Sequence, residues 1–278
     1  MSVTISASDV NKLRQITGAG MMDCKKALSE TGGDFEAAID YLRKKGQKVS
    51  EKRADRETNE GVVVAAVSAD GTYGTIFGLG CETDFVAKND DYVNFAKAIS
   101  AIAMANKPAT KDALLGMQFE DITIAEKIAE QVGKIGEKIE ITDYALITGE
   151  QVVGYNHSNG KVGVLVAMNK KGDAIEAAGK DVTMQIAAMA PIAIDKNDVP
   201  EEVKTREMEI GREQARAEGK PEAILEKIAT GKLEAYYKDA TLLNQKFVKD
   251  NSKTIREVLS GVEKDLTVTA FKRIALGA

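Results

Sequence analysis

The sequence has no tryptophan, one histidine, two cysteines and few aromatic residues, and each shortage excludes something. Because only 5% of the residues are Phe or Tyr, the cores must consist mainly of Ala, Val, Ile, Leu and Met. Cys24 and Cys81 lie far apart and outside any metal-ligand spacing, which is typical of free thiols in a reducing compartment. His157 alone is a poor metal site. We therefore expect no disulfide, no metal and no cofactor.

Long hydrophobic runs and a basic surplus are also lacking. No apolar run approaches the roughly 18 residues of a membrane-spanning helix, and the first residues show no basic segment followed by an apolar one. We expect a cytoplasmic protein that does not contact a membrane. The chain has 38 Lys and Arg against 43 Asp and Glu, a net charge of −5. This balance argues against direct binding of a nucleic-acid backbone.

Sequence motifs that are typical of enzymes are missing as well. The sequence contains neither G-x-x-x-x-G-K-[ST] nor a G-x-G-x-x-G run after a strand, so no phosphate-binding loop is predicted. A nucleophilic Cys81 would need a base, and His157 is the one histidine of the chain. We expect no enzyme. A site built from Cys81 and His157 is the alternative.

Residues 1–50 are predicted to form a three-helix docking module. Apolar residues recur there at helical spacing in three short runs, separated by glycines at 18 and 20 and at 32 and 33. We expect Asp34 to cap the third helix and Gly46 to end it. A core of this size is marginal alone, which favours a role in binding.

Residues 51–60 are predicted to be a basic linker. Between residues 43 and 56 the sequence has seven basic residues and two acidic ones. A solvated segment is the simplest interpretation of such a run, and a contact with an acidic partner is the alternative.

Residues 61–140 and 141–278 are predicted to form the two lobes of an α+β core. In each lobe two strand-like runs joined by a tight turn, Asp70-Gly71 or residues 158–160 (Ser-Asn-Gly), precede an amphipathic helix. We interpret this order as a duplicated β-β-α unit. Glycines at 74, 78 and 80 within one expected strand indicate that another backbone approaches closely.

The second lobe is interrupted by residues 200–239, which are predicted to form a protruding antiparallel helical hairpin. Proline at 200 and 221 opens each helix, and Gly219 ends the first. The expected seam between the helices consists of Val203, Ile210, Ile224, Leu225 and Ile228. The hairpin could pair with a second copy or only add stability, and the sequence leaves both open.

Residues 81–89 (Cys-Glu-Thr-Asp-Phe-Val-Ala-Lys-Asn) form the most informative segment. They place one large aromatic beside an acid, between an expected strand and an expected helix. Loops in such positions often carry binding groups. On composition alone Phe85 is better explained as a core residue, and an exposed binding residue is the alternative.

Several stretches resemble the elongation factor Ts family. Residues 13–28 and 83–88 are similar to its two signatures, and residues 134–137, 162–166 and 218–221 add further similarity in the same order. The resemblance implies a ubiquitin-associated-like N-terminal module, a two-subdomain core and a protruding helical hairpin. It also implies a guanine-nucleotide exchange factor that binds elongation factor Tu and promotes the release of GDP.

The resemblance also implies which residues bind the partner. In the family the N-terminal module docks on the GTPase, the second signature intrudes beside the nucleotide and its Mg²⁺ ion, and two core positions add contacts. The matching residues are Arg14, Met21 and Met22 for docking, Thr83, Asp84, Phe85 and Val86 for the signature, and Ile135 and His157 for the core. Two adjacent methionines at a helix start cannot both face one small core, which independently favours an exposed binding face.

The sequence departs from the family in two places. Gly78-Leu79-Gly80 stands where the family usually has Glu-x-Asn, which would alter how the signature segment is braced. The chain stops at Ala278, soon after its last expected strand, so the C-terminal helical module of some members is expected to be missing or reduced. The functional alternative to exchange is a binding adaptor or holdase that uses the three-helix module.

Overall fold

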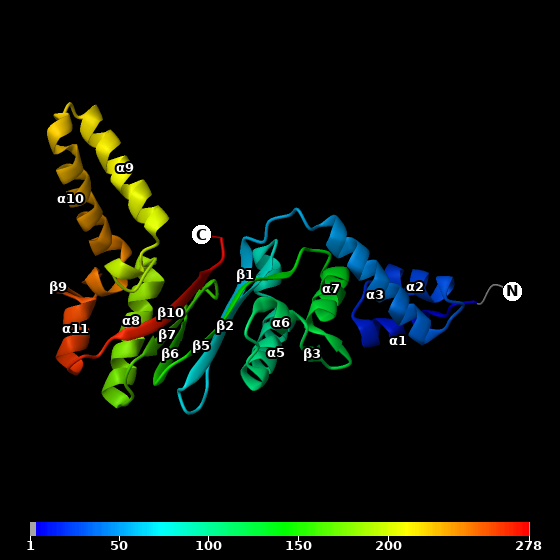
Figure 1. Cartoon of the computed structure of the whole chain (residues 1–278). Helices are drawn as coiled ribbons and strands as arrows, with labels where there is room; N and C mark the ends of the chain where they lie inside the picture. Colours follow the sequence, from blue (N-terminus) through cyan, green and yellow to red (C-terminus); the bar gives the residue numbers. More distant parts are fainter. Residues whose placement is uncertain (1–3, 278) are drawn as a thin grey trace.

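Two three-stranded antiparallel sheets pack face to face, and helices cover the outer face of each (Figure 1). The computed structural model describes residues 4–277. Residues 1–3 and 278, which the predicted first and last modules include, lie outside it. The described chain is an α+β protein, as the sequence predicts.

Three helices form the N-terminal module: α1 (Ala7–Thr17), α2 (Met21–Glu30) and α3 (Phe35–Lys52). Ser6 caps α1 through a capping box with Asp9, and Gly18 ends it with a φ of 65°. The side chain of Asp34 accepts a hydrogen bond from the N–H of Ala37 and caps α3. Leu13 is fully buried in the core that the three helices share.

The predicted end of the third helix at Gly46 is wrong, because α3 continues to Lys52. Gly46 marks instead the place where α3 crosses α7 (Ile124–Ile135). A Cβ atom at this position would lie 2.6 Å from the carbonyl oxygen of Ala129 in α7. Further along α3, Val49 packs against the core of the first lobe. The helix thus extends into the predicted 51–60 linker and joins the N-terminal module to the body.

The first sheet has the order β1-β2-β5, with bounds Glu60–Val67, Tyr73–Cys81 and Glu140–Thr148. The turn between β1 and β2 contains Gly71 at a φ of 69°, as the Asp70-Gly71 pair predicts. The outer face of the sheet is covered by α5 (Asp90–Asn106) and α7. The remaining short elements are α4 (Asp84–Ala87), α6 (Lys111–Leu115), β3 (Gln118–Phe119) and β4 (Ile122–Thr123).

The second sheet has the order β6-β7-β10, with bounds Gln151–Asn156, Val162–Met168 and Val268–Ala275. Its outer face packs against α8 (Asp173–Met189) and α11 (Ile255–Val262). A small pair, β8 (Lys246–Phe247) and β9 (Asp250–Thr254), precedes α11. In both sheets the second strand of the hairpin is central and a helix follows it, in agreement with duplicated β-β-α units.

Glycines let the two sheets approach closely. A Cβ at Gly163 in β7 would lie 2.6 Å from Cγ1 of Val63 in β1, and one at Gly78 in β2 would lie 3.3 Å from Cγ2 of Ile274 in β10. Close backbone approach was predicted at residues 74, 78 and 80. It is confirmed at Gly74, where a Cβ would lie 2.8 Å from the carbonyl oxygen of Ala66, but at Gly78 and Gly80 the nearest atoms belong to side chains. Aliphatic side chains of one sheet occupy the space that a side chain on the other would need.

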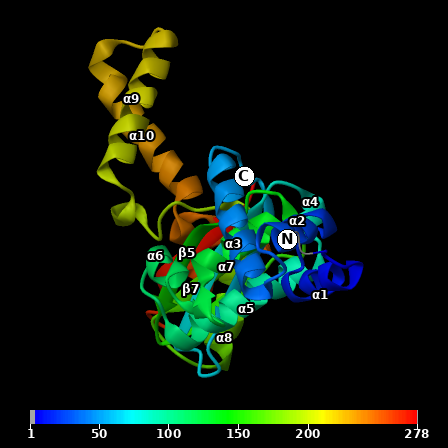
Figure 2. The ribbon, with the colours of Figure 1, turned by 90° about the vertical axis from the view of Figure 1, so that its right-hand side faces the viewer.

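The hairpin of α9 (Glu201–Ala217) and α10 (Glu222–Ala240) projects from the second lobe, which both views show (Figures 1 and 2). Short 3₁₀ helices, Lys196–Asp198 and Leu242–Asn244, flank its base. The predicted seam is wrong for Ile210 and Ile224, which are exposed. Small residues form much of the contact instead, because Gly211 and Ala229 bring the two backbones together. Leu225 is buried, as predicted.

None of the helices between residues 4 and 277 is long and apolar enough to cross a membrane.

The crossing of α3 and α7 can be tested by replacing a glycine with alanine at the crossing and, as a control, at an open position of another helix. Gly46→Ala brings a Cβ into the backbone of α7, so we expect a loss of about 1–3 kcal/mol in the free energy of unfolding. Gly231→Ala in α10 meets no atom within 4 Å and should stabilise the protein by about 0.5–1 kcal/mol. Urea denaturation followed by circular dichroism measures both. Equal stabilisation by the two substitutions would contradict the crossing.

Candidate partner-binding site

The signature segment is one turn of helix and not an open loop. β2 ends at Cys81, and the Thr83 hydroxyl accepts a hydrogen bond from the N–H of Val86, which caps α4. Ala87 is buried and Val86 packs against the core of the first lobe. Phe85 points the other way, with 84% of its surface exposed. The interpretation of Phe85 as a core residue is therefore wrong.

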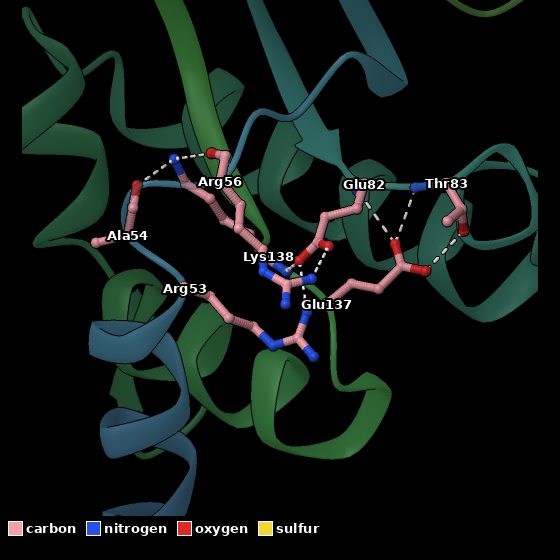
Figure 3. A network of polar contacts seen from close by, with 7 residues as sticks. All are labelled: Arg53, Ala54, Arg56, Glu82, Thr83, Glu137 and Lys138. Carbon is pink, nitrogen blue, oxygen red and sulfur yellow. Dashed lines mark hydrogen bonds and ion pairs between the residues drawn. The ribbon is translucent and has the colours of Figure 1, made fainter.

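The backbone of this turn is held by the carboxylate of Glu137 (Figure 3). The N–H groups of Glu82 and Thr83 donate to Glu137 Oε2 at 3.1 and 3.0 Å, and the Thr83 hydroxyl donates to Oε1 at 2.7 Å. These two N–H groups follow the last residue of β2 and need a partner outside the sheet. One side chain satisfies both and also orients the capping hydroxyl.

Glu82 makes the reciprocal contact (Figure 3). Its Oε1 accepts hydrogen bonds from the N–H of Lys138 at 2.6 Å and from Arg53 at 2.7 Å, and its Oε2 accepts one from Arg56 at 2.7 Å. Partial burial alone would raise the pKa of Glu82. The hydrogen bonds from Lys138, Arg56 and Arg53 outweigh it and lower the pKa from 4.5 to about 2. Glu82 is therefore ionised at neutral pH.

Much of the basic run between residues 43 and 56 is bound within the chain. Arg53 and Arg56 pair with Glu82, and Arg43 pairs with Glu130 of α7 at 2.7 Å. The simple interpretation as a solvated linker is wrong for Arg53, whose side chain is 25% exposed, whereas Arg43 and Arg56 are ion-paired and still largely open to solvent. The bracing role of Glu82 and Glu137 was not predicted, although Glu137 lies in a stretch that resembles the family and Glu82 directly precedes another.

Gly78 and Gly80 do not brace the turn. Both lie within β2, where a Cβ would meet Thr142 or Thr58 of the neighbouring chain segments. Among the described residues, the carboxylates of Glu82 and Glu137 hold the signature turn, so the departure from the family pattern at residues 78–80 leaves its position defined.

Asp84 lies beside Phe85 on the outer side of the turn. Its carboxylate pairs with Lys88 at 2.6 Å, four residues along the chain. The Lys88 ammonium, through a hydrogen bond and its charge, lowers the pKa of Asp84. The turn thus presents an anionic carboxylate next to an exposed aromatic ring.

A hollow of about 220 Å³ lies beside the exposed ring. Its lining includes Phe85 and Val86 from the turn, Gln131, Lys134 and Ile135 from the end of α7, and Tyr92 from α5. The structure therefore brings together three of the predicted site residues, Phe85, Val86 and Ile135, on one surface.

The predicted docking residues lie on the N-terminal module. Arg14 is exposed near the end of α1, and Met21 and Met22 begin α2 with 56% and 73% of their surfaces exposed. Ile16 is also exposed, because Thr17 and not Ile16 continues the inner face of α1. We refer to Arg14, Ile16, Met21 and Met22 as the docking face. Ile16 was absent from the predicted set.

His157 and Cys81 do not form a catalytic pair. The ring nitrogen of His157, in the β6–β7 turn, is hydrogen-bonded to the Tyr155 hydroxyl at 2.7 Å. Cys81 is buried and its thiol donates to the carbonyl oxygen of Thr83 at 3.2 Å. Burial raises the pKa of this thiol to about 11, the opposite of what a nucleophile requires. His157 also lies outside the lining of the hollow beside Phe85.

An exposed aromatic on a hydrogen-bonded turn, together with a second exposed apolar face, is typical of sites of protein–protein interaction. The family model described as Elongation factor TS matches residues 82–278. Curated proteins named Elongation factor Ts are similar over almost their whole length. That of Cytophaga hutchinsonii is 60% identical over 98% of this chain and 99% of its own, and that of Amoebophilus asiaticus is 51% identical over 99% and 100%. The chain belongs to the elongation factor Ts family, whose members act in the elongation step of protein biosynthesis.

The network around Glu82 predicts a pH-dependent contribution to stability. Because its pKa is lower in the folded protein, Glu82 stabilises the fold above pH 4.5, and this contribution is lost as the pH falls towards 2. We expect Glu82→Gln to lower the free energy of unfolding by about 1–3 kcal/mol at pH 7. The difference should shrink between pH 4.5 and 2.

Urea denaturation at several pH values measures this difference. Glu222→Gln is the control, because its pair with Arg216 is largely exposed and should contribute less than about 1 kcal/mol. A difference for Glu82→Gln that is the same at pH 7 and pH 2.5 would show that the carboxylate charge is not responsible.

Proposed function

We propose that the chain binds elongation factor Tu in its GDP-bound form and promotes GDP release by inserting the Phe85 turn beside the nucleotide site. The observation that carries the proposal is the 84% exposure of Phe85 on a turn whose backbone is held by Glu137. Exposing a large aromatic to water is unfavourable, and a fixed turn presents it without the entropy cost of ordering a loop on binding.

Thermodynamic linkage relates the affinity of the factor for the GTPase to the affinity of the GTPase for GDP. A GTPase holds GDP through phosphate contacts, a Mg²⁺ ion and ordered switch segments. A factor that binds the nucleotide-free form more tightly weakens GDP binding by the same ratio. Exchange in this scheme requires no bond to be made or broken by the factor.

The candidate residues divide the task. The docking face holds the partner in register, and its methionines offer an adaptable apolar surface. Phe85 enters between partner helices, with Thr83 and Val86 shaping the turn, and the anionic Asp84 disturbs the Mg²⁺ and phosphate surroundings. Ile135, at the hollow beside Phe85, and His157 add contacts from the core.

Further expectations belong to the same proposal. They are the division into residues 1–50, 51–60, 61–140 and 141–278, a cytoplasmic location, and the absence of direct nucleic-acid binding. Self-association through residues 200–239 stays a prediction, for which the exposed Ile210 and Ile224 offer apolar contacts.

The wedge role of Phe85 is tested by stopped-flow release of a fluorescent GDP analogue from elongation factor Tu. Phe85→Ala should slow the maximal release rate by tens-fold to hundreds-fold, since a buried aromatic anchor contributes roughly 2–4 kcal/mol. Val262→Ala removes an exposed apolar side chain from α11 and should leave release unchanged. Binding of the unmodified protein without faster release would identify a non-exchanging adaptor instead.

The docking face is tested by a charge in place of a methionine. Met22→Glu should raise the factor concentration for half-maximal release about tenfold, because a desolvated unpaired charge opposes association. The maximal rate should change less than about twofold if docking only aligns the partner. Met189→Glu, at an exposed methionine of α8, is the matched control. Equal effects of the two substitutions would remove Met22 from the interface.

A further inference from the structure

We propose that Glu137 and Glu82 are positioning residues that couple the orientation of the Phe85 turn to the end of α3, and thereby to the docking module. The inference rests on the proposed exchange function and extends it to residues that need not touch the partner. Neither residue lines the hollow beside Phe85.

The turn cannot hold its own position. α4 spans four residues, from Asp84 to Ala87, and a single helical turn is unstable by itself. Its apolar attachment comes from Val86 and Ala87 alone. The orientation of Phe85 therefore depends on the three hydrogen bonds that Glu137 accepts from Glu82 and Thr83.

The two glutamates form a reciprocal clasp between two chain segments. Glu137 accepts from the N–H groups of residues 82 and 83, while Glu82 accepts from the N–H of Lys138. Each side chain thus fixes the backbone that carries the other. A displacement of either segment must break or shift hydrogen bonds to a charged group, which are stronger than those between neutral groups.

The clasp is tied to the docking module through α3. Arg53, the C-cap of α3, and Arg56 each donate to Glu82. In addition, Lys138 Nζ donates to the carbonyl oxygens of Ala54 and Arg56, both at 2.9 Å (Figure 3). A partner that moves the docking module therefore acts on Glu82, and through it on the backbone of the Phe85 turn.

A second ion pair provides a matched control. Glu130 of α7 binds Arg43 of α3 at 2.7 Å. It attaches the same helix to the same lobe, with a side-chain exposure of 25% against 16% for Glu82. Glu130 makes no hydrogen bond to residues 82–88 in the described chain. We expect its removal to weaken the attachment of α3 near Arg43 while the hydrogen bonds of Glu82 and Glu137 stay in place.

The experiment measures GDP release from elongation factor Tu over a range of factor concentrations. Glu137→Ala should lower the maximal rate at least tenfold and change the half-saturating concentration less than threefold. Glu137→Gln retains an acceptor oxygen and should recover most of the rate. Glu82→Gln should lower the maximal rate several-fold, and Glu130→Gln less than twofold.

A double-substitution cycle with Phe85→Ala separates positioning from general destabilisation. If Glu137 acts through the Phe85 ring, Glu137→Ala should cause little further loss once the ring is gone. Multiplied effects would overturn the proposal. Hydrogen exchange of the free protein adds a measurement that does not need the partner. The amides of residues 83–89 should exchange at least tenfold faster in Glu137→Ala than in the unmodified protein, and at an intermediate rate in Glu137→Gln. In Glu130→Gln their exchange rates should be unchanged.

The two proposals fail in different ways. If the unmodified protein does not accelerate GDP release, the exchange function itself is wrong. The exchange function stands if the unmodified protein accelerates GDP release. The positioning role is then wrong if Glu137→Ala releases GDP at the same rate and its amide hydrogens exchange as in the unmodified protein. Thermal unfolding of each variant verifies that it is folded at the assay temperature. If Glu137→Ala is not folded at that temperature, Glu137→Gln replaces it in the comparison.

Discussion

The arrangement of the candidate site depends on two carboxylates that accept hydrogen bonds from each other's backbone segments. Glu137 fixes the turn that follows β2, and Glu82 fixes the start of the segment that leads into β5. Because Arg53 also binds Glu82, the end of α3 contacts the same pair of carboxylates. The N-terminal module, the first sheet and the exposed Phe85 are thus joined at one polar cluster, which explains how a one-turn helix can carry an outward-facing aromatic.

The rest of the body reflects the shortage of aromatic residues. With few large rings available, the interior between the sheets consists of aliphatic side chains such as Ile76, Leu165 and Ile274. Glycines on the facing strands, including Gly78 and Gly163, allow the sheets to come close enough for these side chains to fill the space. The same device recurs at Gly46, where two helices cross, and at Gly211 in the projecting hairpin.

Most elements could be predicted because their signals are local. Asp34 caps its helix through an N–H three residues away, the proline at 221 begins a helix through its own fixed φ, and Asp70-Gly71 specifies its own turn. Gly46 was misinterpreted because a glycine at a helix crossing and one at a helix end look alike in sequence. The hairpin seam was misassigned for the related reason that Ile210 is exposed once Gly211 brings the helices together.

The sequence by itself determined the α+β class, the N-terminal three-helix module, the order of the duplicated β-β-α units, and, through the signatures at residues 13–28 and 83–88, the elongation factor Ts family. It also marked Phe85 as the residue of greatest interest. Only the tertiary structure decided that this ring faces solvent. In a single turn the outward side is set by the packing of Val86 and Ala87 and by a carboxylate 54 residues away in sequence. Long-range contacts of this kind produce no local sequence pattern from which the orientation of the ring could be predicted.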